Sequence, residues 1–278
     1  MNDLTVSLVQ TTLHWHDPAA NRAQLAELLA SALPGPGLTD LIVLPEMFTT
    51  GFSMEAASQA EPYPGPTLDW MRTQAARYDA AVTGSVLTEE GGAYFNRLLW
   101  VRPDGTHSTY DKRHLFRLAG EHEVYTAGTS HLIEEWRSWR IRPLICYDLR
   151  FPVWSRNSPH EPYDVLLYVA NWPQPRTEIW RTLLRARAIE NVAYTLGVNR
   201  TGHDGLGQDY AGDSALIDMR GEYLLQAGNF QTCISRTLSW QAQQDFRAKF
   251  PALNDADSFR LAESPRSVLL PGGQPSAN

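Results

Sequence analysis

The sequence predicts an α/β protein with a mixed β-sheet, or two packed β-sheets, in the centre and helices outside. Short apolar segments, typical of strands that are buried on both faces, alternate with longer segments rich in Ala and Leu. Other strand-like segments follow one another directly across turns that contain Gly or Asp, as in antiparallel hairpins. Purely parallel, doubly wound sheets lack such hairpins. A mixed arrangement accommodates both patterns.

The predicted strands are apolar or alternating segments that stop at Pro, Gly or polar residues. In chain order they cover residues 4–10, 41–44, 81–87, 94–101, 106–110, 139–146, 164–170, 194–199, 214–218, 223–226 and 231–238. The turns at 89–92, 103–105 and 219–222 join neighbouring strands as hairpins.

The predicted helices carry start and stop signals. The first begins with Asp17 as its N-cap and Pro18 as its first helical residue, and it ends before the Pro/Gly segment 34–37. Further helices are expected over residues 67–78, 178–191 and 240–249. The glycine-rich segment 202–212 lacks the Gly-x-Gly-x-x-Gly pattern and does not link a strand to a helix. We expect it to be a mobile surface loop near the mouth of a site.

The composition fits one large soluble domain with a sizeable core, since the 278 residues are 43% hydrophobic and 20% charged. No linker-like segment divides the chain, so we expect a single domain over residues 1–278, with a core to about residue 250 and a tail over 251–278. No segment is long and apolar enough for a membrane helix, and the first residues do not resemble a signal peptide. We therefore expect no membrane partner.

The charge and the rare residue types exclude other classes. A formal net charge of −7 disfavours nucleic-acid binding. Two cysteines argue against a disulfide framework and for a reducing compartment, so we expect a cytoplasmic protein. The histidines show no metal-ligand spacing such as His-Glu-x-x-His, so we expect no metal.

Three polar residues lie where predicted core strands end. Glu46, Lys112 and Cys146 each stand at the end of such a strand or just beyond it, where sheet enzymes hold their reacting groups. A thiol can attack an electrophilic carbon, a carboxylate can take its proton and activate water, and an ammonium can stabilise the oxyanion. Together they would transfer an acyl group from a C–N bond, although a lone cysteine can also be an inert core residue.

The segments around these residues resemble a known family. Leu-Pro-Glu-Met-Phe (44–48), Tyr-Asp-Lys-Arg-His-Leu-Phe (110–116) and Leu-Ile-Cys-Tyr-Asp-Leu-Arg-Phe (144–151) are similar, in order and separation, to the three signature segments of the nitrilase superfamily of carbon–nitrogen hydrolases. The resemblance covers nearly the whole chain. It implies a four-layer α-β-β-α sandwich with two mixed sheets, no cofactor, and a homodimer or higher homo-oligomer formed through the outer helices.

The resemblance also implies roles for individual residues. The three polar residues would form a Glu-Lys-Cys triad in which Cys146 forms a thioester with the acyl group. Lys112 and the backbone N–H of Tyr147 would hold the oxyanion. Many members carry a second glutamate upstream of the nucleophile, which we place at Glu121, with Glu123 as the alternative.

Within the superfamily the sequence is most similar to the bacterial omega-amidases, on the forms of the first two motifs, Ala-Asn-Trp-Pro (170–173) and the segment 180–191. Those enzymes release ammonia from small-molecule amides, namely the terminal amides of 2-oxoglutaramate and 2-oxosuccinamate. The same triad would serve an N-carbamoyl amide hydrolase or a nitrilase. A catalytically silent scaffold protein with this fold is an alternative of another class, against which the intact triad argues.

Several neighbouring residues have open assignments. We expect Trp172, Phe116 and Phe48 to line the substrate pocket, since such pockets are mostly apolar, although a place in the core is equally compatible with their position. Arg150 could contact a substrate carboxylate, but we expect it to support its loop by pairing with a carboxylate side chain. His114 is expected to be a structural hydrogen-bonding residue.

Two further features are expected to be structural. Cys233 lies inside a half-buried strand with no motif around it, so we expect it to pack in the core. Arg181, Arg185 and Arg187 are expected to form a solvated or interface face of the helix 178–191.

Overall fold

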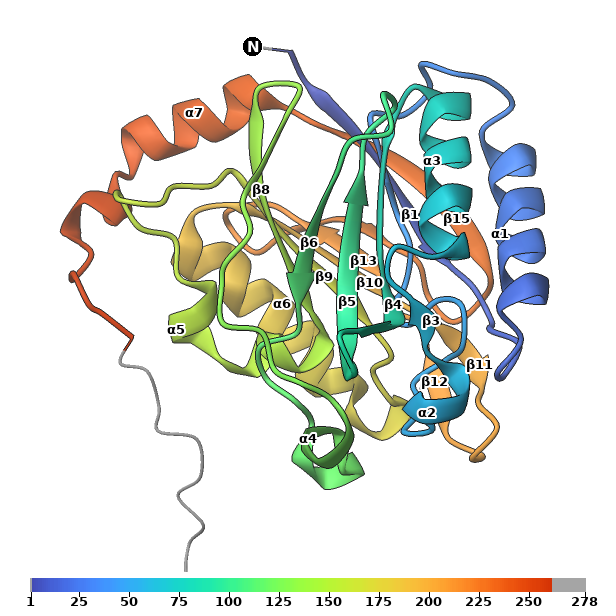
Figure 1. Ribbon diagram of the computed structural model, residues 1–278. Helices are drawn as coiled ribbons and strands as arrows, with labels where there is room; N and C mark the ends of the chain where they lie inside the picture. Colours follow the sequence, from blue (N-terminus) through green and yellow to red (C-terminus); the bar gives the residue numbers. More distant parts are fainter. Residues whose placement is uncertain (1, 262–278) are drawn as a thin grey trace, which may run out of the picture.

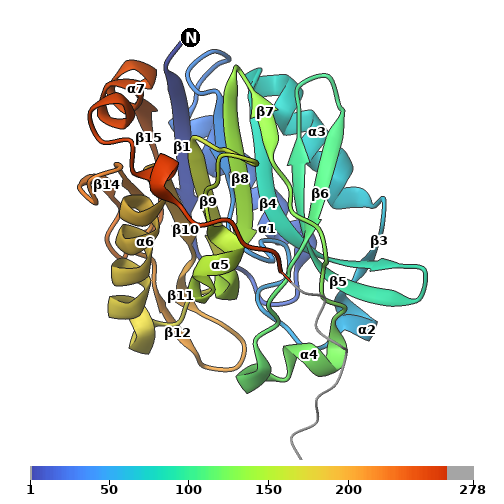
Figure 2. The same cartoon turned by 90° about the vertical axis from the view of Figure 1, so that its left-hand side faces the viewer.

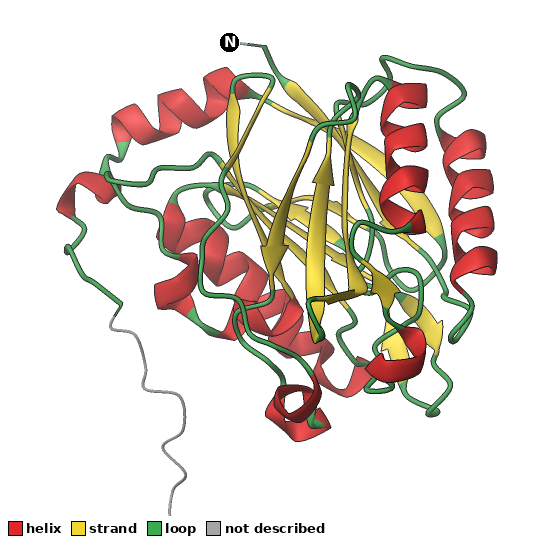
Figure 3. Ribbon diagram, viewed as in Figure 1, coloured by secondary structure: helices red, strands yellow, loops and turns green. Residues whose placement is uncertain are grey.

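Two β-sheets stack face to face between outer helices in the computed structural model, which describes residues 2–261 (Figures 1 and 2). Helices α1 (Pro18–Ala32) and α3 (Pro66–Tyr78) cover one sheet, and α6 (Thr177–Asn191) covers the other, as Figure 3 shows with helices in red and strands in yellow. Both sheets mix parallel and antiparallel pairs. The arrangement is the predicted four-layer α-β-β-α sandwich.

The first sheet contains the N-terminal strands and the last strand of the chain. Its order is β15-β1-β2-β4-β5-β6, with β3 beside β4. Its strands are β1 (Leu4–Gln10), β2 (Leu41–Val43), β3 (Glu61–Pro62), β4 (Ala81–Glu90), β5 (Ala93–Val101), β6 (His107–Asp111) and β15 (Thr232–Leu238). β15 pairs antiparallel with β1. The last strand of the chain therefore lies at the edge of this sheet, next to the first strand.

The second sheet contains the central strands of the chain. Its order is β14-β13-β10-β9-β8-β7, and β8, β9 and β10 run parallel. Its strands are β7 (Glu134–Trp136), β8 (Trp139–Ile145), β9 (Val165–Ala170), β10 (Tyr194–Asn199), β13 (Ala215–Ile217) and β14 (Tyr223–Gln226). A separate hairpin of β11 (Thr201–His203) and β12 (Asp209–Ala211) follows β10.

The remaining helices are short, apart from the one that follows β15. They are α2 (Ala56–Gln59), α4 (Glu121–Val124), α5 (Pro152–Ser155) and α7 (Trp240–Lys249), together with the 3₁₀ helices η1 (Arg117–Ala119), η2 (Cys146–Arg150), η3 (Gln174–Arg176) and η4 (Ala252–Asp255). Helix α1 starts as predicted, because the Asp17 side chain accepts a hydrogen bond from the Ala20 N–H at 2.9 Å.

The core lies in two layers, one between the sheets and one beneath α1 and α3. Successive side chains of a strand point to opposite faces, and β2 shows the consequence. Leu41 and Val43 pack between the sheets, whereas Ile42 packs with Leu25 of α1 and Leu68 of α3. Both faces of β2 are therefore buried in apolar surroundings, which explains why the strand contains no polar residue.

Strand direction brings the ends of several strands to one edge of the sandwich. β2 and β4 run parallel, and β6 has the same direction because it is antiparallel to β5, which is itself antiparallel to β4. The residues that follow β2 and β6 therefore leave the first sheet at the same edge. In the second sheet β8 and β9 are also parallel to each other. This edge is where the polar residues of the three motifs meet.

The structure differs from the predicted elements in a few places. The nucleophile strand ends at Ile145, and Cys146 already belongs to η2. The segment 202–212, predicted to be a loop, contains most of the β11–β12 hairpin. Beyond residue 250, Ala252 and Leu253 still pack against the core, so the compact part extends past the predicted boundary.

Two further sequence predictions concern the ends and the surface of the molecule. The loose part of the predicted tail, residues 262–278, lies outside the described residues. Among the helices formed by residues 2–261, none combines the length and the apolar character that a membrane span requires.

Candidate active site

Glu46 is fully buried in the turn that follows β2. Its Oε1 accepts a hydrogen bond from Asn96 Nδ2 at 2.8 Å, and its Oε2 accepts one from the Asn171 N–H at 2.7 Å. Asn171 Nδ2 also donates to the Glu46 backbone carbonyl at 2.6 Å. The next residue, Met47, has a φ of 41°, a left-handed conformation that is uncommon outside glycine. The carboxylate is thus held from both sheets, by Asn96 of β5 and by the residue after β9.

Lys112 lies directly after β6 and is 1% exposed. Its Nζ donates to Glu46 Oε1 at 2.8 Å and to both Glu121 carboxylate oxygens at 3.0 Å. Burial alone lowers the pKa of a lysine, but the Glu121 and Glu46 carboxylates outweigh it and raise the pKa of Lys112 above its ordinary value. The ammonium is therefore a fixed positive charge between two carboxylates.

Glu121 is the second glutamate that contacts Lys112. It is fully buried at the start of α4, and its carboxylate also accepts a hydrogen bond from the Phe116 N–H. Burial raises the pKa of Glu121, and the charge of Glu46 adds to this, while Lys112 acts in the opposite direction. The alternative, Glu123, has a side chain that is 75% exposed. The structure brings Glu121 to Lys112 and leaves Glu123 at the surface.

Cys146 opens η2 with a φ of 40°, again in the left-handed region. A non-glycine residue in this region costs on the order of 1–3 kcal/mol, and such strain persists only where the surroundings enforce it. The buried Sγ lies 4.0 Å from the Asn171 carbonyl oxygen and faces the Glu46 carboxylate. Burial raises the pKa of the thiol, Glu46 raises it further, and Lys112 lowers it only in part. The sulfur is therefore a protonated thiol beside a carboxylate.

Asp148 connects the second and third motif segments below Cys146. Its Oδ2 accepts from the Tyr110 hydroxyl at 2.7 Å and from the Ile145 N–H at 3.0 Å. Its Oδ1 accepts from the backbone N–H of His114 at 3.0 Å and contacts the imidazole Nδ1 at 2.7 Å. The imidazole also stacks on Phe151, with ring centroids 3.7 Å apart. The predicted structural role of His114 is confirmed by these contacts.

A cavity of about 300 Å³ opens above Cys146 and Lys112. Trp172 and Phe116 line it, as expected, and Tyr147, predicted to bind through its backbone N–H, lines it as well. The β11–β12 hairpin lines it as well, through Asp204 and Tyr210 among others, so the glycine-rich segment does lie at the site. A thiol and an ammonium at the floor of a mostly apolar cavity, with the Glu46 carboxylate buried behind them, form an arrangement that can attack a small carbonyl compound.

Phe48 does not line this cavity, contrary to the prediction. Its side chain is fully buried in the layer beneath α1 and α3, where its ring lies 5.9 Å from that of Trp70. Gly84 makes the room, because a Cβ there would lie 2.9 Å from the Phe48 ring. Phe52, a little further along the same loop, lines the cavity instead.

Arg150 also departs from the prediction. Within residues 2–261 its side chain pairs with no carboxylate, and its guanidinium lies over the Trp172 ring, 5.4 Å from the centroid. The residue lines the cavity. Support for the loop of Arg150 comes instead from Arg187, which is 4% exposed and donates to the Leu149 carbonyl at 2.6 Å. Arg187 is thus buried within the chain, so the prediction that it belongs to a solvated or interface face of this helix is wrong.

Cys233 lies at the edge of the core, as predicted. It is half-buried in β15 and packs against the layer beneath α1 and α3. Burial raises the pKa of its thiol to about 12. With no charged partner among the causes of that shift, it has none of the chemical surroundings of Cys146.

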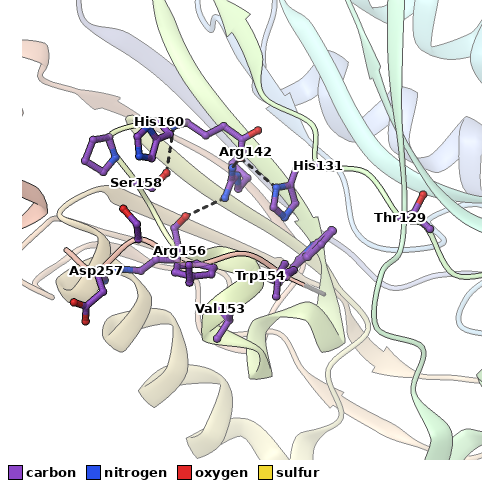
Figure 4. A pocket seen from close by; sticks show the side chains of 14 residues that line it. Thr129, His131, Arg142, Val153, Trp154, Arg156, Ser158, His160 and Asp257 are labelled. Carbon is purple, nitrogen blue, oxygen red and sulfur yellow. Dashed lines mark hydrogen bonds and ion pairs between the residues drawn. The ribbon is translucent and has the colours of Figure 1, made fainter. Parts of the chain in front are cut away.

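A larger cavity, of about 550 Å³, lies between α5 and the C-terminal residues 257–261 (Figure 4). Three of its titratable or charged side chains lie together. Arg142 forms an ion pair with Glu161, and His131 Nδ1 lies 3.2 Å from the same carboxylate. Among the described residues that line it there is no cysteine or lysine, whereas the smaller cavity contains both.

Sequence reasoning missed Asn96, Asn171, Phe52 and Arg176 as site residues. Asn171 could have been found, because it follows an apolar strand directly, as Cys146 does. Asn96 carried a weaker signal, a polar residue inside a hairpin strand. Phe52 lies in an irregular loop and Arg176 in the three-residue 3₁₀ helix η3, and neither segment has a periodicity in the sequence that fixes the direction of a side chain.

Comparison with known proteins agrees with this geometry. Residues 5–247 match the carbon-nitrogen hydrolase family, and the chain belongs to this family, part of the nitrilase superfamily. The predicted family is therefore confirmed.

Individual relatives indicate which kind of carbon–nitrogen hydrolase the chain resembles. The chain is 49% identical over 264 residues to Omega-amidase YafV of Escherichia coli (strain K12), covering 94% of this chain and 100% of that protein. It is 32% identical over 219 residues to the 2-oxoglutaramate amidase of Bacillus subtilis (strain 168), covering 78% and 84%. The crystal structure of XC1258 from Xanthomonas campestris, a CN-hydrolase superfamily protein with an arsenic adduct in its active site, shares 50% identity at a TM-score of 0.91, covering 94% of this chain and 100% of that one.

The protein is an amidase of the nitrilase superfamily. It is a hydrolase of carbon–nitrogen bonds other than peptide bonds, in linear amides, so the predicted enzyme class is also confirmed. Its substrate is accordingly a small-molecule amide.

Proposed function

We propose that this amidase hydrolyses the terminal amide of 2-oxo dicarboxylic acid monoamides, 2-oxoglutaramate and 2-oxosuccinamate, through a thioester on Cys146. One observation carries the chemistry: Cys146, Glu46, Lys112 and Glu121 lie together below one small cavity. The substrate class rests on the relatives, which are named as omega-amidase and 2-oxoglutaramate amidase.

In the first half-reaction Glu46 accepts the thiol proton while Sγ forms a bond to the amide carbon. A base is needed because the raised pKa keeps Cys146 protonated at neutral pH. The carbonyl becomes an oxyanion, which the Lys112 ammonium and the N–H of Tyr147 stabilise. The C–N bond then breaks, Glu46 returns the proton to the nitrogen, and ammonia leaves.

In the second half-reaction a water molecule attacks the thioester. Glu46 accepts a proton from this water, the same oxyanion site stabilises the second tetrahedral intermediate, and the C–S bond breaks. The thiol recovers its proton and the 2-oxo dicarboxylic acid is released. Glu121 assists by holding Lys112 through two hydrogen bonds of 3.0 Å, which keep the ammonium at the oxyanion position throughout.

The experiment is ammonia release by the purified protein from 2-oxoglutaramate, with glutamine and an N-carbamoyl amino acid in parallel. We expect release from the 2-oxo acid amide, and a loss of at least about a thousandfold in Cys146→Ala, because residues that act as one unit fail together. Cys233→Ala is the matched control and should keep its activity. Release from the carbamoyl compound alone, or from none of the three, would contradict the proposed substrate.

The proposed assembly comes from the family resemblance, and the proposed location from the low cysteine content. We propose a cytoplasmic homodimer or higher homo-oligomer, associated through the outer helices, in which residues 1–278 of each chain form a single domain. Light scattering of the purified protein after size-exclusion chromatography measures the subunit number, and a monomer at micromolar concentration would contradict the proposed assembly.

A further inference from the structure

Two guanidinium groups line the cavity that contains the nucleophile. Arg150 comes from η2, and Arg176 ends η3, after the strand β9. Within residues 2–261 neither side chain forms an ion pair or donates a hydrogen bond. Several other buried or half-buried arginines are paired. Arg97, for example, pairs with Asp111 at 2.6 Å and with Glu90 at 2.7 Å. Two unpaired cations in one cavity indicate that their counter-charge comes from a ligand.

Aromatic rings hold both groups in place without neutralising them. The Arg150 guanidinium lies 5.4 Å from the centroid of the Trp172 ring, and that of Arg176 lies 5.2 Å from the centroid of Phe116. Trp172 is itself fixed, because it is 3% exposed and its Nε1 donates to the Arg176 carbonyl at 2.8 Å. A guanidinium stacked on a ring keeps its N–H donors free in the plane, where they can bind a carboxylate in bidentate fashion.

The remaining charges of the cavity do not compensate the two arginines. Lys112 is neutralised by the two glutamates behind it. Asp204 is the single carboxylate in the described lining, and its oxygens already accept from the N–H groups of Leu206 and Gln208 and from the Tyr210 hydroxyl, each at 2.9 Å. The cavity therefore has an excess of positive charge away from the nucleophile, which favours an anionic ligand.

We propose that Arg150 and Arg176 together bind the carboxylate end of the substrate and so determine that this amidase acts on amides with an anionic far end. This inference rests on the proposed function, because it concerns the acyl part of the same substrate. With the amide carbon at Cys146, the carboxylate and the adjacent 2-oxo oxygen supply acceptors for both guanidinium groups. A cavity of about 300 Å³ suits a small acid of this kind.

The two arginines differ in their value as a test. Arg150 belongs to the same 3₁₀ helix as Cys146, so its replacement could also shift the nucleophile. Arg176 belongs to a different element, and among residues 2–261 its side chain has no hydrogen-bond or ion-pair partner to lose. Arg176→Gln is therefore the decisive variant and Arg150→Gln supports it. Arg77→Gln is the matched control, because Arg77 is exposed on the outer helix α3.

The experiment follows alkylation of Cys146 by iodoacetamide in a Cys233→Ala background, read by intact mass, with and without 2-oxoglutarate. We expect 2-oxoglutarate to protect the parent and Arg77→Gln. In Arg176→Gln and Arg150→Gln the concentration that gives half protection should rise roughly 30-fold or more, the cost of leaving a charged partner unpaired. The alkylation rate without 2-oxoglutarate should stay unchanged in Arg176→Gln, which shows that the nucleophile is intact.

Steady-state kinetics completes the test and separates this inference from the proposed function. For 2-oxoglutaramate we expect the KM of Arg176→Gln to rise by a similar factor, with a smaller change in kcat. Ammonia release from 2-oxoglutaramate by a parent and an Arg176→Gln variant with equal KM would overturn the arginine site and leave the proposed function standing. Protection that depends on both arginines, in a protein that does not hydrolyse 2-oxoglutaramate, would support the site and remove that substrate. A parent that 2-oxoglutarate does not protect would overturn the site directly.

Discussion

At the scale of single residues, the state of Cys146 follows from what surrounds it. A cysteine reacts fastest as the thiolate. Here burial and the charge of Glu46 both favour the neutral thiol. Lys112 offsets these two effects only in part, because its ammonium already donates hydrogen bonds to two carboxylates. A cysteine in such a place reacts well only when its proton is transferred during attack. The carboxylate of Glu46 faces the thiol and can receive it.

Alkylation of Cys146 in the absence of substrate is therefore expected to be slow at about pH 7 and to accelerate about tenfold per pH unit towards about pH 9. The reason is that the raised pKa of Cys146 leaves only a small fraction of the thiol deprotonated, and this fraction grows tenfold with each pH unit. The measurement is the rate of iodoacetamide addition by intact mass in a Cys233→Ala background. A rate that is constant from about pH 6 upward would instead indicate a preformed thiolate–lysine pair and contradict this account.

At the scale of elements, the packing of α6 against β10 depends on one glycine. Gly197 faces the helix, and a Cβ at that position would lie 2.5 Å from Leu184 and 2.6 Å from Trp180, both buried side chains of α6. The helix can approach the strand closely only because the side chain is absent. Since Arg187 of the same helix holds the Leu149 carbonyl beside the nucleophile, the position of α6 also affects the site.

We expect Gly197→Ala to lower the free energy of unfolding by roughly 1–3 kcal/mol, because overpacking forces α6 or its side chains to shift. Gly35→Ala is the matched control, since a Cβ at Gly35 meets no atom within 4 Å. Urea denaturation followed by circular dichroism compares the two variants with the parent. Equal unfolding midpoints for Gly197→Ala and Gly35→Ala would show that the helix is not held at this close distance.

At the scale of the whole molecule, the site exists only because the two sheets are joined at one edge. Tyr110 belongs to β6 of the first sheet and Ile145 to β8 of the second, and both donate to the same buried Asp148 carboxylate. Glu46 likewise receives hydrogen bonds from Asn96 of one sheet and from Asn171 after a strand of the other. Hydrogen bonds between the sheets thus set the relative positions of the reactive groups.

Asp148→Asn is expected to lower the free energy of unfolding by roughly 2–5 kcal/mol, because an amide cannot accept from all four N–H and O–H groups and leaves buried donors unpaired. Ammonia release should fall as well, since the residue positions η2. Chemical denaturation and the amidase assay measure the two effects. Asp245→Asn, at an exposed position of α7, is the control. If Asp148→Asn unfolded at the same midpoint as this control, the role of Asp148 in joining the sheets would be wrong.

Much of the architecture could be predicted from the chain alone. The strands that lie inside the sandwich and the four longest helices lie near their predicted positions. Strands buried on both faces appear in a sequence as short apolar runs, and helices begin and end at recognisable capping residues. The short strands β3, β7, β11 and β12 were missed. Each has only two or three residues, too few for a period of two to be visible.

The sequence by itself determined the family and the residues of the proposed chemistry: a cysteine, a glutamate and a lysine at strand ends, within three motifs typical of that family. The tertiary structure decided which side chains surround that chemistry. It placed Phe48 in the core and Phe52 at the cavity, and it brought Glu121 rather than Glu123 to Lys112. Within the described residues 2–261 it left Arg150 and Arg176 without a carboxylate partner. The physical reason is that a side chain in a turn or a 3₁₀ helix takes its direction from neighbours distant in the chain, such as Gly84 beneath Phe48, and not from any local period.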